Sequence, residues 1–213
     1  MRIISDDLLD LVAGGRIRVN DETTVVTVTI TGAPIDPGSG NPPYTGGGSN
    51  GGGSSNGPHH NSPVPTQMPA NVNIDLLRNT VLTVSQEIKA MANKDDLEHG
   101  AFVVRMANGD LRVGPISTGE QQSNMASVDL APGETIVAWV HDHPTGASVD
   151  NQQYASVADM NELHSLESSN PAVSPNTLVY IVDMASGDTF EFQSNYNARS
   201  DKPGANISTD YHP

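Results

Sequence analysis

The chain has 213 residues, no cysteine, and 10 Lys and Arg against 25 Asp and Glu, which gives a formal net charge of −15. This charge disfavours contact with phosphate backbones and anionic membranes, so we expect no nucleic-acid partner. No apolar run approaches the roughly 20 residues of a transmembrane helix, so we expect no membrane insertion. Without cysteine, disulfides and thiolate metal ligands are excluded.

The first 15 residues form an acidic amphipathic segment that ends in Gly14 and Gly15. The segment resembles the double-glycine leaders of bacteriocins and of other substrates of peptidase-containing ABC exporters. The apolar positions at the expected offsets from the glycine pair are Ile4, Leu9 and Val12. The resemblance implies cleavage after Gly15 and secretion from a bacterial cell, although Leu8 stands where these leaders usually have glutamate. The alternative is a short helix with a glycine C-cap in a cytoplasmic protein.

Residues 16–35 contain a short β segment, because the stretch 22–31 (ETTVVTVTIT) alternates apolar and polar side chains. An unpaired strand of this kind would be an aggregation-prone edge, so we expect it to pair with another strand. Residues 36–70 then form a linker. Nine of the 20 glycines and six of the 15 prolines lie between Asp36 and Pro65. Such a segment has too few apolar groups to build a core, and we expect it to be disordered.

Residues 71–197 carry the pattern of a folded domain, followed by a polar tail at 198–213. Apolar residues with helical spacing predict helices over 73–93 and 151–167. The continuous apolar run at 135–141 predicts a buried central strand. Further strands are expected at 101–106, 111–116, 178–182 and 189–192, arranged as two hairpins around turns with glycine. This order of elements predicts an α+β domain with one core.

Two histidines stand at the end of the expected central strand, in the sequence His141-Asp142-His143-Pro144. Residues two apart on a strand face the same side, so both imidazoles can reach one cation. Zinc commonly binds neutral imidazole nitrogens together with a carboxylate. Asp159 on the following helix could supply that carboxylate, and Ser156 lies one turn before it.

These residues resemble the signature of the JAB/MPN metalloprotease family, also called JAMM, which is a glutamate, then His-x-His-Pro, then Ser-x-x-Asp. The resemblance covers residues 73–193 and is closest to the bacterial branch appended to toxins and secreted proteins. It implies an MPN/JAB-like (cytidine-deaminase-like) mixed sheet flanked by helices. It implies Zn²⁺ held by His141, His143 and Asp159, with Glu98 as the base and Ser156 as a donor to the oxyanion. The function implied is zinc-dependent hydrolysis of a peptide or isopeptide bond in a peptide or protein substrate, by an exported effector or toxin.

Several positions leave alternatives open. Twelve residues separate His143 from Ser156, a longer loop than the family usually has, so Asp150 is a rival to Asp159 as third ligand. Glu87 is the alternative to Glu98 as the base, although its mid-helix position suits a solvated face. The alternative function is a catalytically inactive MPN-like module that binds a partner.

Overall fold

The structure is a computed structural model that describes residues 26–29, 62–95, 97–120, 126–143, 153–198 and 203–208. The candidate leader with Gly14 and Gly15 lies outside the described residues, and so do Pro144 and Asp150. The predictions made for those positions are therefore not tested by the structure.

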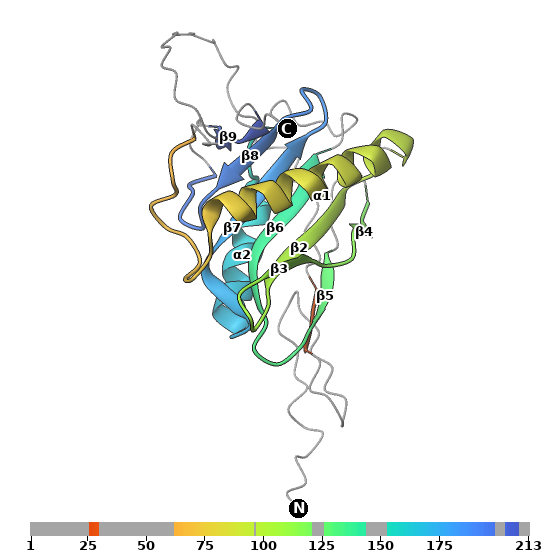
Figure 1. Ribbon diagram of the computed structural model, residues 1–213. Helices are drawn as coiled ribbons and strands as arrows, with labels where there is room; N and C mark the ends of the chain where they lie inside the picture. Colours follow the sequence, from red (N-terminus) through yellow and green to blue (C-terminus); the bar gives the residue numbers. More distant parts are fainter. Residues whose placement is uncertain are drawn as a thin grey trace, which may run out of the picture.

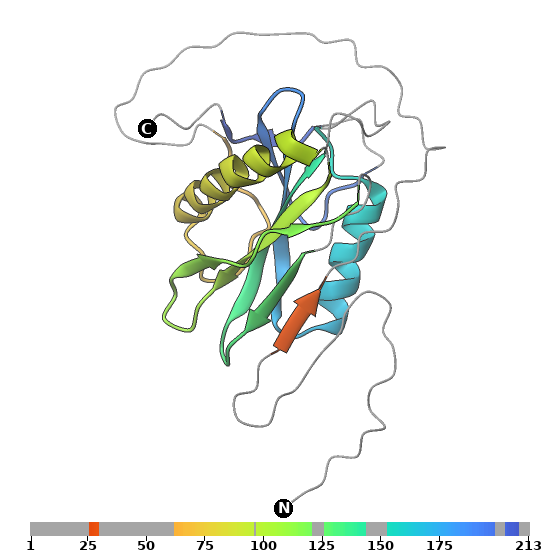
Figure 2. The same ribbon diagram turned by 90° about the vertical axis from the view of Figure 1, so that its right-hand side faces the viewer.

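The predicted α+β class is confirmed. In the described part of the chain, helices α1 (Ile74–Asp95) and α2 (Val157–Ser169) lie on opposite faces of a mixed sheet (Figures 1 and 2). The strand order is β3-β2-β6-β7-β8-β9, with β4 also paired to β2. The strands are β2 (His99–Arg105), β3 (Leu111–Val113), β4 (Ser117–Thr118), β6 (Thr135–His143), β7 (Val173–Asp183), β8 (Thr189–Phe192) and β9 (Ala205–Asn206). Neither described helix is both long and apolar enough to cross a membrane.

Strand β6 is central because it is apolar on both faces, as its sequence predicts. It pairs antiparallel with β2 and parallel with β7, and α2 is the crossover between β6 and β7. In such a unit the end of the first parallel strand lies beside the start of the crossover helix. The carboxyl end of β6, which carries the two histidines, therefore lies near the first turn of α2.

Alternation along the strands builds one apolar layer under each helix. The layer under α1 includes Leu77, Ile88, Ala101, Val103, Val140 and Tyr180. The layer on the α2 face includes Phe102, Trp139, Met160, Leu163, Val179 and Ile181. Since side chains of one strand alternate between the layers, His141 and His143 share the α2 face with Trp139, whereas Asp142 faces α1.

The predicted early strand is confirmed as β1 (Val26–Thr29), and it pairs as expected. Its partner is β5 (Ser127–Leu130), in an antiparallel two-stranded sheet that places Val28 opposite Val128. The Val28 side chain is buried in the layer on the α2 face. Strand β1, which precedes the predicted linker, is thus part of the folded domain.

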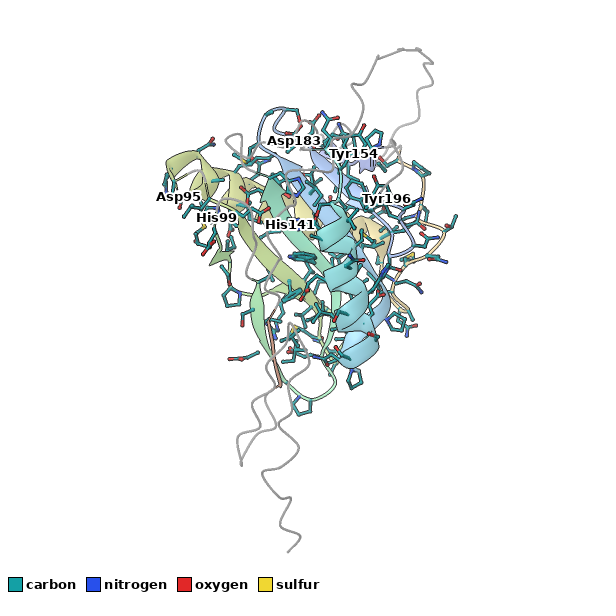
Figure 3. All side chains as sticks on the ribbon, turned by 180° about the vertical axis from the view of Figure 1, so that it is seen from behind. Asp95, His99, His141, Tyr154, Asp183 and Tyr196 are labelled. Carbon is teal, nitrogen blue, oxygen red and sulfur yellow. The ribbon has the colours of Figure 1, made fainter. Side chains whose placement is uncertain are left out.

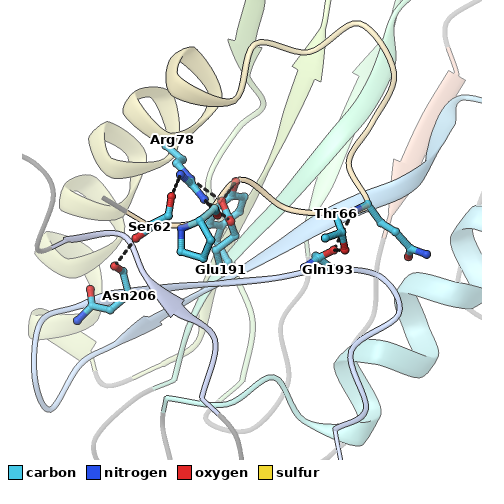
Figure 4. A network of polar contacts seen from close by, with 9 residues as sticks. Ser62, Thr66, Arg78, Glu191, Gln193 and Asn206 are labelled. Carbon is cyan, nitrogen blue, oxygen red and sulfur yellow. Dashed lines mark hydrogen bonds and ion pairs between the residues drawn. The ribbon is translucent and has the colours of Figure 1, made fainter. Parts of the chain in front are cut away.

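The ordered domain extends beyond the predicted bounds of 71 and 197. On one side, Arg78 donates hydrogen bonds to the carbonyl oxygens of Ser62 (3.1 Å) and Pro63 (2.9 Å) (Figure 4). On the other, β9 pairs with β8, and Ile207 is fully buried. The described part of the predicted polar tail therefore completes the sheet edge, and the expectation of a loose tail is wrong there. Two residues of strand give no periodic signal in the sequence.

Helix α2 begins later than predicted, at Val157 rather than near residue 151. Ser156 is its N-cap: the Ser156 Oγ accepts the N–H of Asp159 (3.1 Å), and the Asp159 carboxylate accepts the N–H of Ser156 (2.7 Å). This reciprocal pair is a capping box, which fixes the first turn of a helix. Tyr154 and Ala155 are buried but precede the helix, which explains why apolar spacing placed its start too early.

Candidate metal centre

Three elements bring the predicted metal-binding residues to one place. His141 and His143 end β6, and Asp159 lies in the first turn of α2. Figure 3 shows the face that α2 covers, with His141 beside the N-terminal end of that helix. Glu98 immediately precedes β2, whose residue Gly100 lies opposite His141 in the antiparallel pair. Because residues 98 and 100 share a face, Glu98 lies on the same side of the sheet as the imidazoles.

The distances between these groups are short. Ligand atoms of Glu98, His141 and His143 all lie within 4.8 Å of one another, and all three residues are buried. One Asp159 oxygen lies 3.5 Å from His141 Nε2, and the other lies 3.6 Å from His143 Nε2. The buried Glu/His/His group could bind a metal ion, and the carboxylate of Asp159 adjoins both imidazoles.

The donor atoms fit a metal. None of the four ring nitrogens of His141 and His143 has a hydrogen-bond partner, and both residues are almost completely buried. Buried polar atoms without a partner are rare in native proteins and call for an unseen one. Around a tetrahedral zinc ion with bonds of 2.0–2.1 Å, neighbouring ligand atoms lie about 3.4 Å apart. The two imidazole–carboxylate distances match this spacing and exceed that of an ordinary hydrogen bond.

The electrostatics of Asp159 suit a ligand that stays ionised. Burial by itself would raise the pKa of this carboxyl, but the imidazoles of His141 and His143, at 3.5 and 3.6 Å, outweigh burial and hold the pKa well below its usual range. The position in the first turn of α2 adds to this effect, because the amino end of a helix favours negative charge. Asp159 is thus an anion held between two imidazoles.

The two imidazoles differ from each other. Burial lowers the pKa of His141 below its ordinary value, which favours the neutral form that binds metal. Burial also acts to lower the pKa of His143, but the neighbouring carboxylates of Asp159, Glu98 and Asp142 raise it overall. In the metal-free protein, His143 therefore binds a proton more strongly than His141 does.

Glu98 has the properties of a proton acceptor near neutral pH. Burial raises the pKa of its carboxyl to about 8, with His143 acting in the opposite direction and Asp159 adding to the increase. Its backbone is fixed on both sides, because the Glu98 N–H donates to the Glu120 carbonyl (3.0 Å) and the Gly119 N–H donates to the Glu98 carbonyl (2.7 Å). Glu87, the alternative base, is exposed on α1 and lies on the other face of the sheet.

Ser156 lies next to the carboxylate of Asp159 through the capping box. Its oxygen accepts the Asp159 N–H, and that bond leaves the hydroxyl hydrogen available to a second acceptor. The structure therefore places the predicted oxyanion donor at the end of α2 that adjoins the histidines.

Three further buried groups surround the predicted ligands. Trp139 stacks on His141, with ring centroids 4.2 Å apart. Asp142 and His99 lie together on the α1 face, directly behind the centre, and burial raises the pKa of Asp142 to about 7 although the His99 N–H opposes the shift. Predicting that Asp142 and His99 are neighbours would require the register in which β2 pairs with β6, and the sequence alone does not specify that register.

No family model, curated protein or solved structure matches this chain. The resemblance to the JAB/MPN family therefore rests on the signature residues of the sequence alone.

Proposed function

We propose that the protein is a zinc-dependent hydrolase of amide bonds, of the JAB/MPN type, that acts on a peptide or isopeptide bond in a peptide or protein substrate. One observation carries the proposal: two buried imidazoles without hydrogen-bond partners converge on the Asp159 carboxylate, with the Glu98 carboxylate beside them. Two imidazoles and a carboxylate are a common ligand set of catalytic zinc, which keeps a further position open for water.

In this proposal, His141, His143 and Asp159 hold the ion. Zinc at this site would lower the pKa of a bound water toward about 7 and polarise a carbonyl group. Glu98 accepts the proton of the attacking water and returns it to the leaving amine, because its pKa lies close to neutral pH. The Ser156 hydroxyl donates a hydrogen bond to the developing oxyanion, a contact typically worth about 3 kcal/mol.

The test uses the full chain, purified without chelator and assayed for metal content and for cleavage of peptide and isopeptide libraries. We expect about one zinc per chain, removal of zinc by His141→Ala, and retention of zinc with loss of hydrolysis in Glu98→Gln. Glu87→Gln is the matched control, because it makes the same change on the exposed face of α1 and should leave turnover unchanged.

Two results would overturn parts of this proposal. Undiminished hydrolysis in Glu98→Gln would reject Glu98 as the base. Full zinc occupancy without cleavage of any library member would reject the hydrolase and favour the alternative, a metal-containing MPN-like module that binds a partner.

We also propose that the chain leaves a bacterial cell through a peptidase-containing ABC exporter, which cleaves after Gly15. The support is the spacing of the apolar residues from the glycine pair. Mass spectrometry of the exported product should find an N-terminus at Arg16. An extracellular product that still begins at Met1 would contradict the proposal.

A further inference from the structure

A second buried polar cluster lies behind the metal centre, on the α1 face of the sheet. It consists of the buried residues His99 at the start of β2 and Asp142 between the two histidines of β6, with the exposed Asp95 of α1 at its edge. His99 Nδ1 lies 3.8 Å from Asp142 Oδ1, and His99 Nε2 lies 3.4 Å from Asp95 Oδ2. The side chains of His99 and Asp142 are completely buried. The roles proposed above for the metal ligands, Ser156 and Glu98 do not use this cluster.

The contact that links this cluster to the centre is made through the backbone. The last described pair between β2 and β6 is Gly100 with His141, so His99 and Asp142 follow at the end of the ladder. There the Asp142 carboxylate accepts a hydrogen bond from the backbone N–H of His99. This N–H belongs to the peptide group that joins Glu98 to His99.

The same peptide group is held at its other end. Its carbonyl, that of Glu98, accepts the N–H of Gly119 at 2.7 Å. A peptide unit is planar, so fixing both its N–H and its C=O fixes the orientation of the whole plane. The direction in which the Glu98 side chain leaves the backbone is therefore set by Gly119 on one side and by Asp142 on the other.

The cost of burying Asp142 indicates that this contact matters. Its second oxygen, Oδ2, is buried and has no hydrogen-bond partner. A buried carboxylate with an unpaired oxygen destabilises a fold. Asp142 lies between the two histidines of the metal centre, and its carboxylate contacts the peptide group that follows Glu98. An acceptor retained there despite its cost is well placed to orient the Glu98 side chain.

We propose that Asp142 is a positioning residue, which orients Glu98 toward the metal centre by holding the N–H of the Glu98–His99 peptide. The inference rests on the proposed role of Glu98 as the base. The inference predicts that activity requires an acceptor oxygen on the side chain of residue 142 but not a negative charge there. An amide should therefore substitute for the carboxylate without loss of activity.

The test compares the wild type with five full-length variants loaded with zinc. Asp142→Ala removes the acceptor and should lower kcat by about 10–100-fold, the usual effect of losing a residue that orients a metal site, with KM and zinc content unchanged. Asp142→Asn keeps the acceptor and should restore kcat. Asp95→Asn is the matched control, because it removes a charge from the same cluster at the His99 ring, away from the peptide, and should have no effect. In a Glu98→Gln background, Asp142→Ala should lower kcat no further, since both changes act through one group.

A second measurement does not need activity. Hydrogen exchange by NMR should show the His99 amide protected in the wild type and in Asp142→Asn, and exchanging faster in Asp142→Ala, while amides of the β6–β7 ladder stay protected and report an intact fold. A crystal structure of Asp142→Ala should show the Glu98 carboxylate turned away from the imidazoles.

The failures can be separated. If the wild type hydrolyses amides and Asp142→Ala keeps its kcat, the positioning role is wrong and the hydrolase stands. If no protein turns over but exchange and the Glu98 displacement follow the prediction, the hydrolase is wrong and the orientation of Glu98 by Asp142 stands. Additive losses from Asp142→Ala and Glu98→Gln would show that Asp142 acts by another route and would overturn the inference.

Discussion

Two of the buried charged clusters in the described part of the chain differ in one respect. In the first, Arg78 of α1 makes a bidentate ion pair with Glu191 of β8, at 2.9 and 2.7 Å, and the Tyr180 hydroxyl donates to the same carboxylate at 2.9 Å. The other Arg78 donors reach the carbonyls of Ser62 and Pro63 (Figure 4). In the second cluster, the ring nitrogens of His141 and His143 have no hydrogen-bond partner.

The difference separates a structural cluster from a ligand site. A buried network in which every polar atom is paired is complete as it stands and makes the fold rigid. A buried group whose unpaired atoms also converge at the spacing of metal ligands is complete only when an ion binds. The first cluster should therefore govern stability without metal, and the second should contribute to stability mainly when metal is present.

The largest expected effect comes from breaking the complete cluster. Arg78→Met keeps much of the aliphatic stem but leaves the Glu191 carboxylate buried without its partner. Removing one member of a buried ion pair typically costs 3–5 kcal/mol, so we expect a loss of about 3–5 kcal/mol in the free energy of unfolding, measured with urea. Arg112→Met is the control, because its pair with Glu134 is partly exposed and should cost less than about 1 kcal/mol. Equal losses in the two variants would contradict the comparison.

The second largest effect is expected when zinc binds the cluster that contains His141 and His143. Zinc at 100 times its dissociation constant should raise the free energy of unfolding by about 2.7 kcal/mol if it binds only the folded protein. His141→Ala should remove this gain, and Arg112→Met, which is far from the ligands in sequence, should keep it. The measurement is urea unfolding with zinc and with a chelator. The same gain in His141→Ala would place the metal elsewhere.

A smaller effect is expected at the helix that carries Asp159. Ser156→Ala removes the N-cap acceptor and should cost about 1 kcal/mol of stability. Ser156→Thr keeps the hydroxyl and should restore both stability and hydrolysis. Parallel urea unfolding and kinetic measurements separate the two proposed roles, because a loss of stability with unchanged kcat would mean that Ser156 acts only as a cap.

The smallest effect is a dependence on pH at the partly exposed pair. The hydrogen bond from Arg112 lowers the pKa of Glu134 below its ordinary value of 4.5. A carboxyl with a lowered pKa in the folded state stabilises the protein above its ordinary pKa and loses this contribution as the pH falls through the lower value. Glu134→Gln should therefore cost less than about 1 kcal/mol at neutral pH, and the difference from wild type should shrink in acid. A constant difference across that range of pH would contradict this origin.

Local patterns predicted most of the fold. The apolar stripe from Leu77 to Ile88 predicted α1 within two residues of its bounds, and the run at 135–141 predicted the buried strand β6, because each pattern matches a periodicity of its element. Strand β5 was missed, since Ser127 and Asp129 are not β-formers and the strand depends on β1, about 100 residues earlier in the chain. Such pairing is a tertiary property, which local sequence does not encode.

The candidate site was predictable where it depends on spacing and not where it depends on register. Histidines two apart on a strand share a face, and Asp159 was suggested by the Ser-x-x-Asp part of the signature that it resembles. The link from Asp142 to His99 requires knowing that β2 pairs with β6 so that Gly100 lies opposite His141. No pattern within either strand specifies that alignment.

The pairing of β1 with β5 has a practical consequence for the choice of protein to express. A truncation that starts after the glycine-rich stretch would delete Val28 and leave Val128 and Leu130 without the strand that covers them. A truncation that stops at residue 197 would remove Ile207 and uncover the β8 edge. The smallest unit that keeps both sets of contacts therefore runs from before Val26 to beyond Ser208.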